Sequence, residues 1–258
     1  MSGDASPSHG TAPASPAGGG PDARHFHELL RALRAGGGES PPFDPSGAPD
    51  EPLPLFHRWF HEAVGAGVPE PHTMALATAD AEGRPSVRTV MLHDADERGW
   101  HFATHRTSRK GRELAHRPYA ALGFYWAAAG RQVRVAGPVR AADPAESAAD
   151  LRERSPAARV AALVGRQSEV LGSYPELVRA FEEAGERIAR EPDAVAPGWT
   201  RYVLEPEEVE FYQGDPDRRH VRLRYLRERA AAVPGAGDAA GPSHAPAGAV
   251  WRRELLWP

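Results

Sequence analysis

Lys110 is the only lysine among the 31 lysine and arginine residues of the chain. It follows Ser108 and Arg109 at the start of a segment, 108–115, that has helical spacing. Serine caps helices, and the free N–H groups of a first helical turn attract anions, so two cations beside them predict an anion site. A compact ammonium on a flexible stem also makes contacts that a planar guanidinium does not. The alternative is a lysine that survives by chance on a solvated helix face.

Other cationic and amide residues gather at the ends of predicted strands and helices. They are Arg88, Gln132, Gln167, Ser168, Tyr212, Arg218, His220 and Arg222. Positions 218, 220 and 222 have the period of two that places side chains on one face of a strand. Two arginines flanking a histidine repel each other unless an anion or an electron-rich ring lies between them. A solvated strand face is the alternative.

Several catalytic signatures are absent. The chain has no G-x-S-x-G, no P-loop and no G-x-G-x-x-G after a strand, so hydrolase, NTPase and dinucleotide-binding functions lack support. It has no cysteine, which excludes disulfides and thiolate chemistry. His57 and His61 have the i, i+4 spacing of metal ligands, but neither H-E-x-x-H nor a third ligand accompanies them. His101 and His105 lack partners in the same way, and we predict no metal site.

Charge and hydropathy limit the possible partners. The formal net charge is −4 and the pI is about 6.3, which argues against nucleic acid. No basic patch followed by an apolar run marks the N-terminus, and no apolar stretch reaches bilayer length. The sequence therefore predicts a cytoplasmic protein without nucleic-acid or membrane partners.

Low-complexity segments set the predicted domain boundaries. Residues 1–22 and 35–52, and again 232–248, are rich in Gly, Pro, Ala and polar residues and cannot bury enough apolar surface to offset the entropy of ordering. We predict a largely disordered N-terminal extension over 1–51 and a folded domain over 52–231. A disordered insertion over 232–248 then precedes a C-terminal segment, 249–258, that completes the domain.

Hydrophobic periodicity predicts a mainly β fold with attached helices. Helical spacing occurs at 24–34, 53–64, 108–115 and across the block 144–190. Strand patterns cover 73–79, 86–93, 100–104, 119–126, 131–140, 199–204, 209–212, 221–227 and 249–256, with polar turns at 80–85 and 94–99. Many short antiparallel strands with a late helical block indicate an α+β protein built on a small β-barrel.

A series of short motifs occurs in the order in which one flavoprotein family has them. They are Pro52-Leu53-x-Leu55-Phe56-x-x-Trp59, Met74–Ala79, Arg88–Leu92, Phe102-Ala103-Thr104, Ser108-Arg109-Lys110, Arg131-Gln132-Val133, Arg166-Gln167-Ser168, Glu210–Gly214, Arg218-x-His220-x-Arg222 and Trp251–Pro258. Over residues 52–258 the chain therefore resembles the FMN-dependent pyridoxamine/pyridoxine 5′-phosphate oxidase family. It is also similar to the flavin oxidases of phenazine biosynthesis, a branch of that family.

The resemblance implies an FMN-binding split β-barrel and a homodimer with FMN in a cleft between subunits. By family position, the cofactor-binding residues would be Arg88, Thr89, Val90, Met91, Thr104, Arg109, Lys110, Gln132, Gln167, Ser168, Tyr212 and Arg222. Arg88, Arg109, Lys110 and Ser168 would hold the phosphate. Gln132 would meet the polar edge of the isoalloxazine and Arg222 its N1/O2 end, while Tyr212 replaces the usual Trp. Arg218 and His220 would be the catalytic pair on the substrate side.

The chain departs from the family at the substrate. The family binds the phosphate of its vitamin substrate with Lys, Tyr, Arg and Ser, and this chain has His93, Asp150, Arg154 and Ala158 there. The predicted substrate-binding set is therefore His93, Asp150 and Arg154 together with Arg218 and His220. A lost hydrogen bond to a charged group costs about 1.5–3 kcal/mol, so three changes would weaken phosphate binding by several powers of ten.

Three functions follow as hypotheses. The leading one is an FMN-dependent oxidase that passes a hydride or two electrons from a reduced ring to FMN and then to oxygen. Its substrate would be a phenazine-like or other secondary-metabolite intermediate without a phosphate. The second is a true pyridoxamine/pyridoxine 5′-phosphate oxidase that makes pyridoxal 5′-phosphate. The third is a non-catalytic protein on the same barrel, either a flavin or haem carrier or a dimeric interaction protein that has lost its cofactor.

Overall fold

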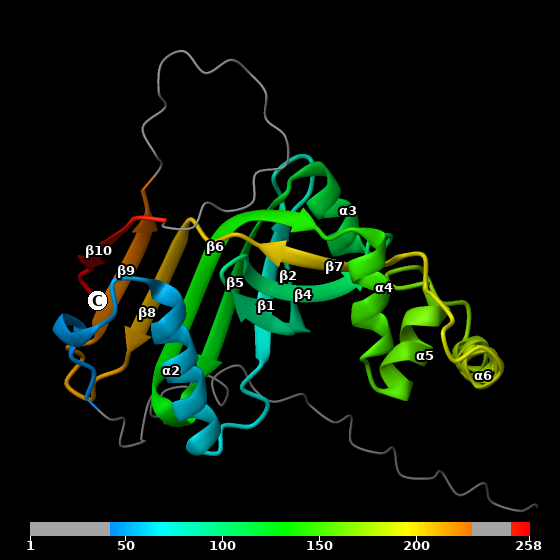
Figure 1. The fold of residues 1–258 in the computed structure, drawn as a ribbon, viewed down its shortest axis with the longest axis horizontal. Coiled ribbons are helices and arrows are strands. Elements are labelled where there is room, and N and C mark those ends of the chain that lie inside the picture. Colours follow the sequence, from blue (N-terminus) through cyan, green and yellow to red (C-terminus); the bar gives the residue numbers. More distant parts are fainter. Residues whose placement is uncertain (1–41, 229–248) are drawn as a thin grey trace, which may run out of the picture. The chain divides into compact units, whose positions relative to one another are not determined.

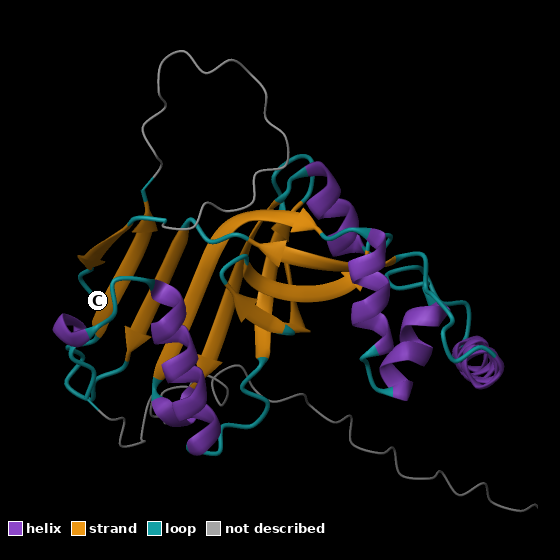
Figure 2. Ribbon diagram, in the orientation of Figure 1, coloured by secondary structure: helices purple, strands orange, loops and turns teal. Residues whose placement is uncertain are grey.

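The computed structural model describes residues 42–228 and 249–258. Within them lie five α-helices, two short 3₁₀ helices and ten strands, most of them at the sites that the hydrophobic pattern predicts (Figures 1 and 2). The helices are η1 (Pro45–Gly47), α2 (Pro52–Gly65), α3 (Arg109–His116), η2 (Ala127–Ala129), α4 (Pro144–Arg152), α5 (Pro156–Val164) and α6 (Tyr174–Arg190). The predicted helix 24–34 and the predicted disorder of 1–41 and 232–248 lie outside the described residues.

Antiparallel pairing joins the ten strands. They are β1 (Thr73–Ala79), β2 (Pro85–Met91), β3 (Asp94–Asp96), β4 (Gly99–His105), β5 (Tyr119–Trp126), β6 (Arg131–Ala141), β7 (Trp199–Leu204), β8 (Glu208–Gln213), β9 (Val221–Arg227) and β10 (Trp251–Leu255). The main path is β10-β9-β8-β6-β5-β1-β2, and β3, β4 and β7 form a second layer that joins it through β6. Residues 94–99, predicted to be only a turn, include β3, because Asp94 pairs with His101 of β4.

The strand β6 belongs to both parts of the sheet. Its first half pairs with β8, and beyond Gly137-Pro138 it pairs with β7. A side chain at Gly137 would lie 1.9 Å from the carbonyl oxygen of Glu205, so only glycine permits the close crossing. The bend turns the sheet into the half-barrel of a split β-barrel, as the sequence predicts.

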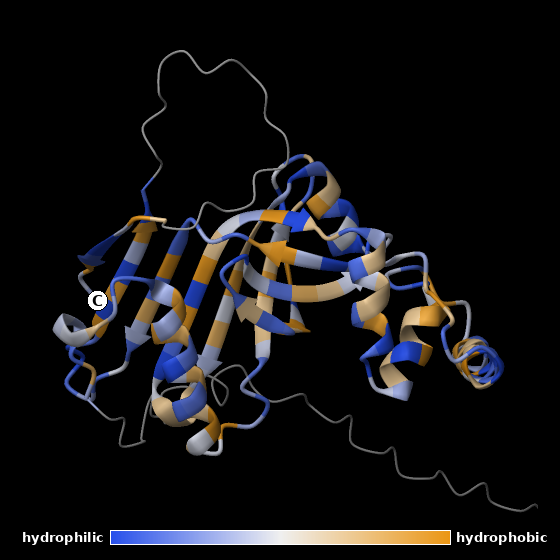
Figure 3. Cartoon of the chain, in the orientation of Figure 1, coloured by the Kyte–Doolittle hydropathy of each residue, from blue (hydrophilic) through white to orange (hydrophobic). Residues whose placement is uncertain are grey.

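The helix α2 covers one face of the main sheet and supplies the centre of the core. Its Phe56 ring lies 5.3 Å from Trp100 and 5.2 Å from Phe124. Trp59 packs edge-on against Phe211 at 5.2 Å. The hydropathy colouring shows the alternation along the strands that this face requires (Figure 3).

Residues 42–51, which the sequence assigned to the N-terminal extension, also lie against this core. The Phe43 ring contacts Trp59 at 5.0 Å. The Tyr225 hydroxyl donates to the carbonyl of Pro49 at 2.8 Å, and Arg253 donates to that of Ala48 at 2.6 Å. The packed structure thus begins before residue 52.

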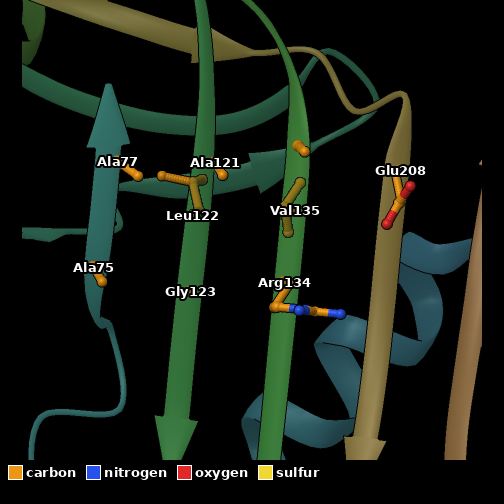
Figure 4. Close-up of a pocket in the computed structure, with 9 residues that line it drawn as sticks. Ala75, Ala77, Ala121, Leu122, Gly123, Arg134, Val135 and Glu208 are labelled. Carbon is orange, nitrogen blue, oxygen red and sulfur yellow. The ribbon is translucent and has the colours of Figure 1, made fainter. Parts of the chain in front are cut away.

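The opposite, outer face of the sheet carries small and exposed apolar side chains. A hollow of about 360 Å³ lies there, lined mainly by alanines and glycine of β1, β5 and β6 (Figure 4). Val87, Met91 and Tyr125 are each more than half exposed on the same face. No helix in the described residues has the length and apolar character needed to span a membrane.

Candidate functional site

The residues of the predicted anion site lie at the start of α3. The Ser108 hydroxyl accepts from the backbone N–H of Gly111 and caps the helix, as its residue type predicts. A Cβ at Gly111 would lie 2.4 Å from the carbonyl oxygen of Arg106, so the chain can turn this tightly into the helix only with glycine there. The turn places Arg109 and Lys110 in the first helical turn, where the positive end of the helix dipole favours an anion.

Lys110 is the centre of a group that we call the cationic cradle: Arg88, Thr104, Arg109, Lys110, Gln167 and Ser168. The Lys110 side chain is buried, and its Nζ donates to Oε1 of Gln167 at 2.9 Å. Thr104 donates to the same oxygen at 3.0 Å. The backbone N–H of Arg109 donates to the Ser168 hydroxyl at 3.1 Å. Residues from three distant segments therefore meet where the sequence predicts them.

Glu113 is a member of this site that the sequence reasoning missed. Its carboxylate is buried and accepts from Arg109 Nε at 2.8 Å and from Arg88 Nη2 at 3.1 Å. Thr78 and Ser86 donate to it at 2.5 and 2.6 Å. The spacing of Arg109 and Glu113, i and i+4 on one helix, was the available signal.

Charge in the cradle favours a dianion. Burial alone would raise the pKa of Glu113, but the four hydrogen bonds it accepts lower that pKa to about 2, so it is ionised. Burial, and then the nearby Arg88 guanidinium, lower the pKa of Lys110 to about 8, against the attraction of Glu113. Arg88, Arg109 and protonated Lys110 outweigh the one carboxylate, which leaves a local charge of +2. This donor set fits a phosphate monoester.

Gln132, Tyr212 and Arg222 form a second group, which we call the polar row. Cross-strand register aligns Gln132 of β6 with Tyr212 of β8, and Tyr212 with Arg222 of β9. Three adjacent side chains on one sheet face, about 4.8 Å apart from strand to strand, give a flat polar surface.

Glu210 holds Arg222 in this row. Its buried carboxylate accepts from Arg222 Nε at 2.8 Å and Nη2 at 3.2 Å, and it also pairs with Arg134. Burial would raise the pKa of Glu210, but the two arginines lower it, so the carboxylate is charged. These hydrogen bonds fix the orientation of the Arg222 guanidinium relative to a ligand bound on the polar row.

The loop between β8 and β9 carries the predicted catalytic pair. Arg218 is exposed and has φ of 66°, a conformation that costs energy for a residue with a side chain. The backbone N–H of Asp215 donates to Nδ1 of His220 at 3.0 Å. Since Nδ1 accepts, the neutral imidazole carries its proton on Nε2. The His220 ring lies 5.1 Å from that of Tyr212, so the loop adjoins the polar row.

Within one chain the cradle and the polar row lie on opposite faces of the sheet. Arg88 pairs with Leu76 on the neighbouring strand, Leu76 pairs with Leu122, and Leu122 pairs with Val135. Paired side chains share one face of a sheet, and Val135 is buried on the core face, so Arg88 lies on that face too. Gln132 is three residues from Val135 along β6, so its side chain points to the outer face. The Cα atoms of Arg88 and Gln132 are also far apart. Three strand spacings across the sheet and three residues along the strand place them roughly 17 Å from each other. One ligand therefore cannot contact both groups of a single chain.

Two residues of the predicted cofactor set lie on the other side of their strand. In β2, Arg88 and Val90 face the core side, and Val90 packs against the core. Thr89 and Met91 alternate with them and face the outer surface. Their side chains do not join the cradle.

The residues at the predicted substrate site contact each other. We call His93, Asp150, Arg154 and Trp199 the Asp150 cluster. Arg154 pairs with the Asp150 carboxylate, and His93 Nδ1 lies 3.3 Å from Oδ1. The Trp199 indole N–H donates to Oδ2 at 3.0 Å. Burial would raise the pKa of Asp150, but these three side chains lower it well below its usual range. Trp199 was not among the predicted residues.

The histidine pairs with the spacing of metal ligands, such as His57 and His61, have no further ligand beside them in the part of the chain that the structure describes. There, no group of three or more His, Cys, Asp or Glu side chains is arranged to hold a metal ion. His57 instead makes a 2.8 Å hydrogen bond to the carbonyl of Ala95.

Comparison with known proteins identifies the family. A family model described as Pyridoxamine 5'-phosphate oxidase matches residues 60–188. A second, described as Pyridoxine 5'-phosphate oxidase C-terminal dimerisation region, matches residues 199–258. The Pyridoxine/pyridoxamine 5'-phosphate oxidase of Burkholderia mallei (strain SAVP1) is 46% identical over 181 residues, which cover 70% of this chain and 84% of that protein.

Two solved structures share the fold. PhzG from Burkholderia lata 383, in complex with tetrahydrophenazine-1-carboxylic acid, is 32% identical with a TM-score of 0.72, over 86% of this chain and 100% of that one. A pyridoxamine 5'-phosphate oxidase-related, FMN binding protein from Nostoc punctiforme PCC 73102 is 21% identical with a TM-score of 0.58, over 80% and 96%. The sequence motifs, the split barrel and these matches agree: the chain belongs to the pyridoxamine 5'-phosphate oxidase family.

Proposed function

We propose that the protein is an FMN-dependent oxidase whose substrate is a reduced ring compound without a phosphate group. The observation that carries the cofactor assignment is the cationic cradle, which joins Lys110, Arg88, Arg109 and the Ser168 hydroxyl around the start of α3. The cradle has the charge and the donors for the FMN phosphate.

The same proposal requires a homodimer with FMN between the subunits. The cradle and the polar row of one chain face opposite ways, so the cradle of one subunit would be completed by the polar row of its partner. The match of residues 199–258 to a dimerisation region supports this arrangement. The exposed apolar side chains and the hollow on the outer sheet face offer surface for it (Figure 4).

Bound FMN would supply the two-electron acceptor chemistry. In the proposed arrangement the Arg222 guanidinium, fixed by Glu210, offers a positive charge to the N1/O2 end of the flavin ring. Gln132 contributes amide hydrogen bonds to the ring edge. His220 would present Nε2–H, and Arg218 a guanidinium, to a substrate on the open side of the flavin, where both would donate hydrogen bonds that orient it.

The Asp150 cluster supports a substrate without a phosphate. At the positions where the family binds the substrate phosphate, Arg154 is paired with a carboxylate inside the protein. A phosphate would meet that negative charge. PhzG, to which this chain is similar, was solved with tetrahydrophenazine-1-carboxylic acid, a reduced ring that carries a carboxylic acid instead of a phosphate. We propose a phenazine-like substrate class for the same reason.

Steady-state oxygen consumption with two substrate types tests this function. We expect turnover of a dihydrophenazine-type carboxylic acid with kcat/KM at least about 100-fold above that for pyridoxine 5′-phosphate, the ratio produced by losing one or two charge-assisted hydrogen bonds. The 46% identity to pyridoxine/pyridoxamine 5'-phosphate oxidases favours the other ranking. Efficient oxidation of pyridoxine 5′-phosphate would refute the substrate assignment, and no oxidation of any reduced ring would indicate a flavin carrier.

FMN affinity should fall as the pH rises above 8. The pKa of Lys110 in the free protein is lowered to about 8, so its ammonium is present below this pH and is lost above it. Bound phosphate favours the protonated form, so at pH 9 the dissociation constant should be about tenfold higher than at pH 7.5. Fluorescence titration of the apoprotein measures it. The Lys110→Met variant should bind weakly with no such dependence, and a parallel slope in that variant would assign the effect elsewhere.

A further inference from the structure

We infer that the Asp150 carboxylate is a built-in anion that fills a subsite made by His93, Arg154 and Trp199, and that Trp199 is a specificity-determining residue of this enzyme. The inference rests on the proposed function, because it explains how the site rejects phosphorylated substrates. It adds that the anion subsite is present in the fold and is closed by a side chain of the chain itself.

The donors come from three separate elements and converge on one carboxylate. His93 follows β2, Arg154 follows α4, and Trp199 begins β7. Arg154 donates to both oxygens, with Nε 3.4 Å from Oδ2, and the Trp199 indole donates to Oδ2 at 3.0 Å. His93 Nδ1 lies 3.3 Å from Oδ1 and 2.5 Å from Arg154 Nη2. The Asp150 side chain is only 2% exposed, so these side chains replace water as its partners.

Charge decides what this subsite accepts. With Asp150 ionised, the carboxylate cancels the charge of Arg154, and an incoming phosphate finds no net attraction and a fixed negative charge. Without the carboxylate, the same side chains would offer a guanidinium, an imidazole and an indole N–H around the space that the carboxylate occupies. That set matches the bidentate and single hydrogen bonds by which proteins hold phosphate.

Trp199 has a fixed position in this cluster. Its ring contacts His105 edge-on at a centroid distance of 5.7 Å, and it packs against the small core of Leu151, Ala162 and Ala196. The indole N–H therefore stays directed at position 150 whether or not a carboxylate is there. Trp199→Phe removes the donor and keeps an aromatic ring in the same packing.

The test measures inorganic phosphate binding to FMN-saturated protein by calorimetry, which needs no turnover. Wild-type protein should show no binding at millimolar phosphate. Asp150→Ala should bind phosphate at least about tenfold more tightly than wild type, the effect of freeing one charged hydrogen-bond donor. The double variant Asp150→Ala, Trp199→Phe should bind phosphate about five- to tenfold more weakly than Asp150→Ala alone. Asp150→Ser, whose short side chain also vacates the subsite, is the second variant if Asp150→Ala does not fold.

Each outcome decides the inference. Phosphate binding to Asp150→Ala that is no tighter than to wild type would overturn the built-in anion, and an unchanged gain in the double variant would overturn the role of Trp199. Constant flavin absorbance during the titration excludes displacement of FMN from the cradle. The kcat/KM for pyridoxine 5′-phosphate should rise in parallel. An enzyme that oxidises no ring substrate but still gains phosphate binding would refute the proposed function and leave this inference standing.

Discussion

Replacing His220 by Ala should leave the protein fully loaded with FMN and reduce kcat by about 10- to 100-fold, the scale of a lost hydrogen bond that orients the substrate at the flavin. The imidazole is held by the backbone N–H of Asp215 on Nδ1, so Nε2–H is the group offered to a substrate. Its neighbour Tyr212 packs 5.1 Å away and stays in place without it. The substitution therefore removes a hydrogen-bond donor and retains the surface on which the flavin would lie.

Anaerobic stopped-flow measurement of flavin reduction separates this effect from oxygen chemistry. The reductive rate should fall while the absorbance per subunit is unchanged. Arg219→Ala is the matched control in the same loop. Among the described residues, its exposed side chain pairs with Asp215 and Asp217, so its removal should change the rate little. A His220→Ala enzyme that reduces its flavin at the wild-type rate would remove this residue from the mechanism.

Replacing Lys110 by Ala should weaken FMN binding by about 1.5–3 kcal/mol, or roughly 10- to 150-fold, the cost of removing a hydrogen bond to a charged group. The side chain is buried and already directed by Gln167 at 2.9 Å, so little ordering is needed when a phosphate arrives. Removing it lowers the charge of the cradle from +2 to +1.

Riboflavin provides the internal control, because it has the ring of FMN without the phosphate. Its affinity should be the same in wild-type protein and in Lys110→Ala. Arg112→Ala, on the exposed side of the same helix, should bind FMN as wild type does. Full flavin occupancy of Lys110→Ala after dialysis, or an equal loss for riboflavin, would show that Lys110 does not hold the phosphate.

Local patterns predicted most of the fold. Strand alternation and helical spacing located β1, β2, β5, β6 and the helices of 144–190, because each depends on a buried face that the sequence displays. The strand β3 was missed, since two aspartates around one alanine pair with β4 only through tertiary contact. The Ser108 cap was predictable because capping depends on a single residue and its immediate neighbours.

The partners of buried charges could not be predicted in the same way. Glu113, Glu210 and Trp199 each complete a site, yet their contacts cross between segments 25 to 49 residues apart or between neighbouring strands. Register decides such contacts, and a sequence does not display it. Register also places the cradle and the polar row on opposite faces, which is the physical reason for proposing that a second subunit completes the flavin site. The order of the sequence motifs predicted which residues belong to the cationic cradle and the polar row, but not that the two groups lie on opposite faces of the sheet.

Parallel titration of the apoprotein with FMN and with riboflavin, followed by quenching of flavin fluorescence, is the most direct test that the cationic cradle holds a phosphorylated flavin. We expect saturation at one FMN per subunit and an affinity for riboflavin at least about 100-fold lower, since the phosphate would make several charge-assisted hydrogen bonds. Equal affinities for the two flavins, or no binding of FMN, would contradict it.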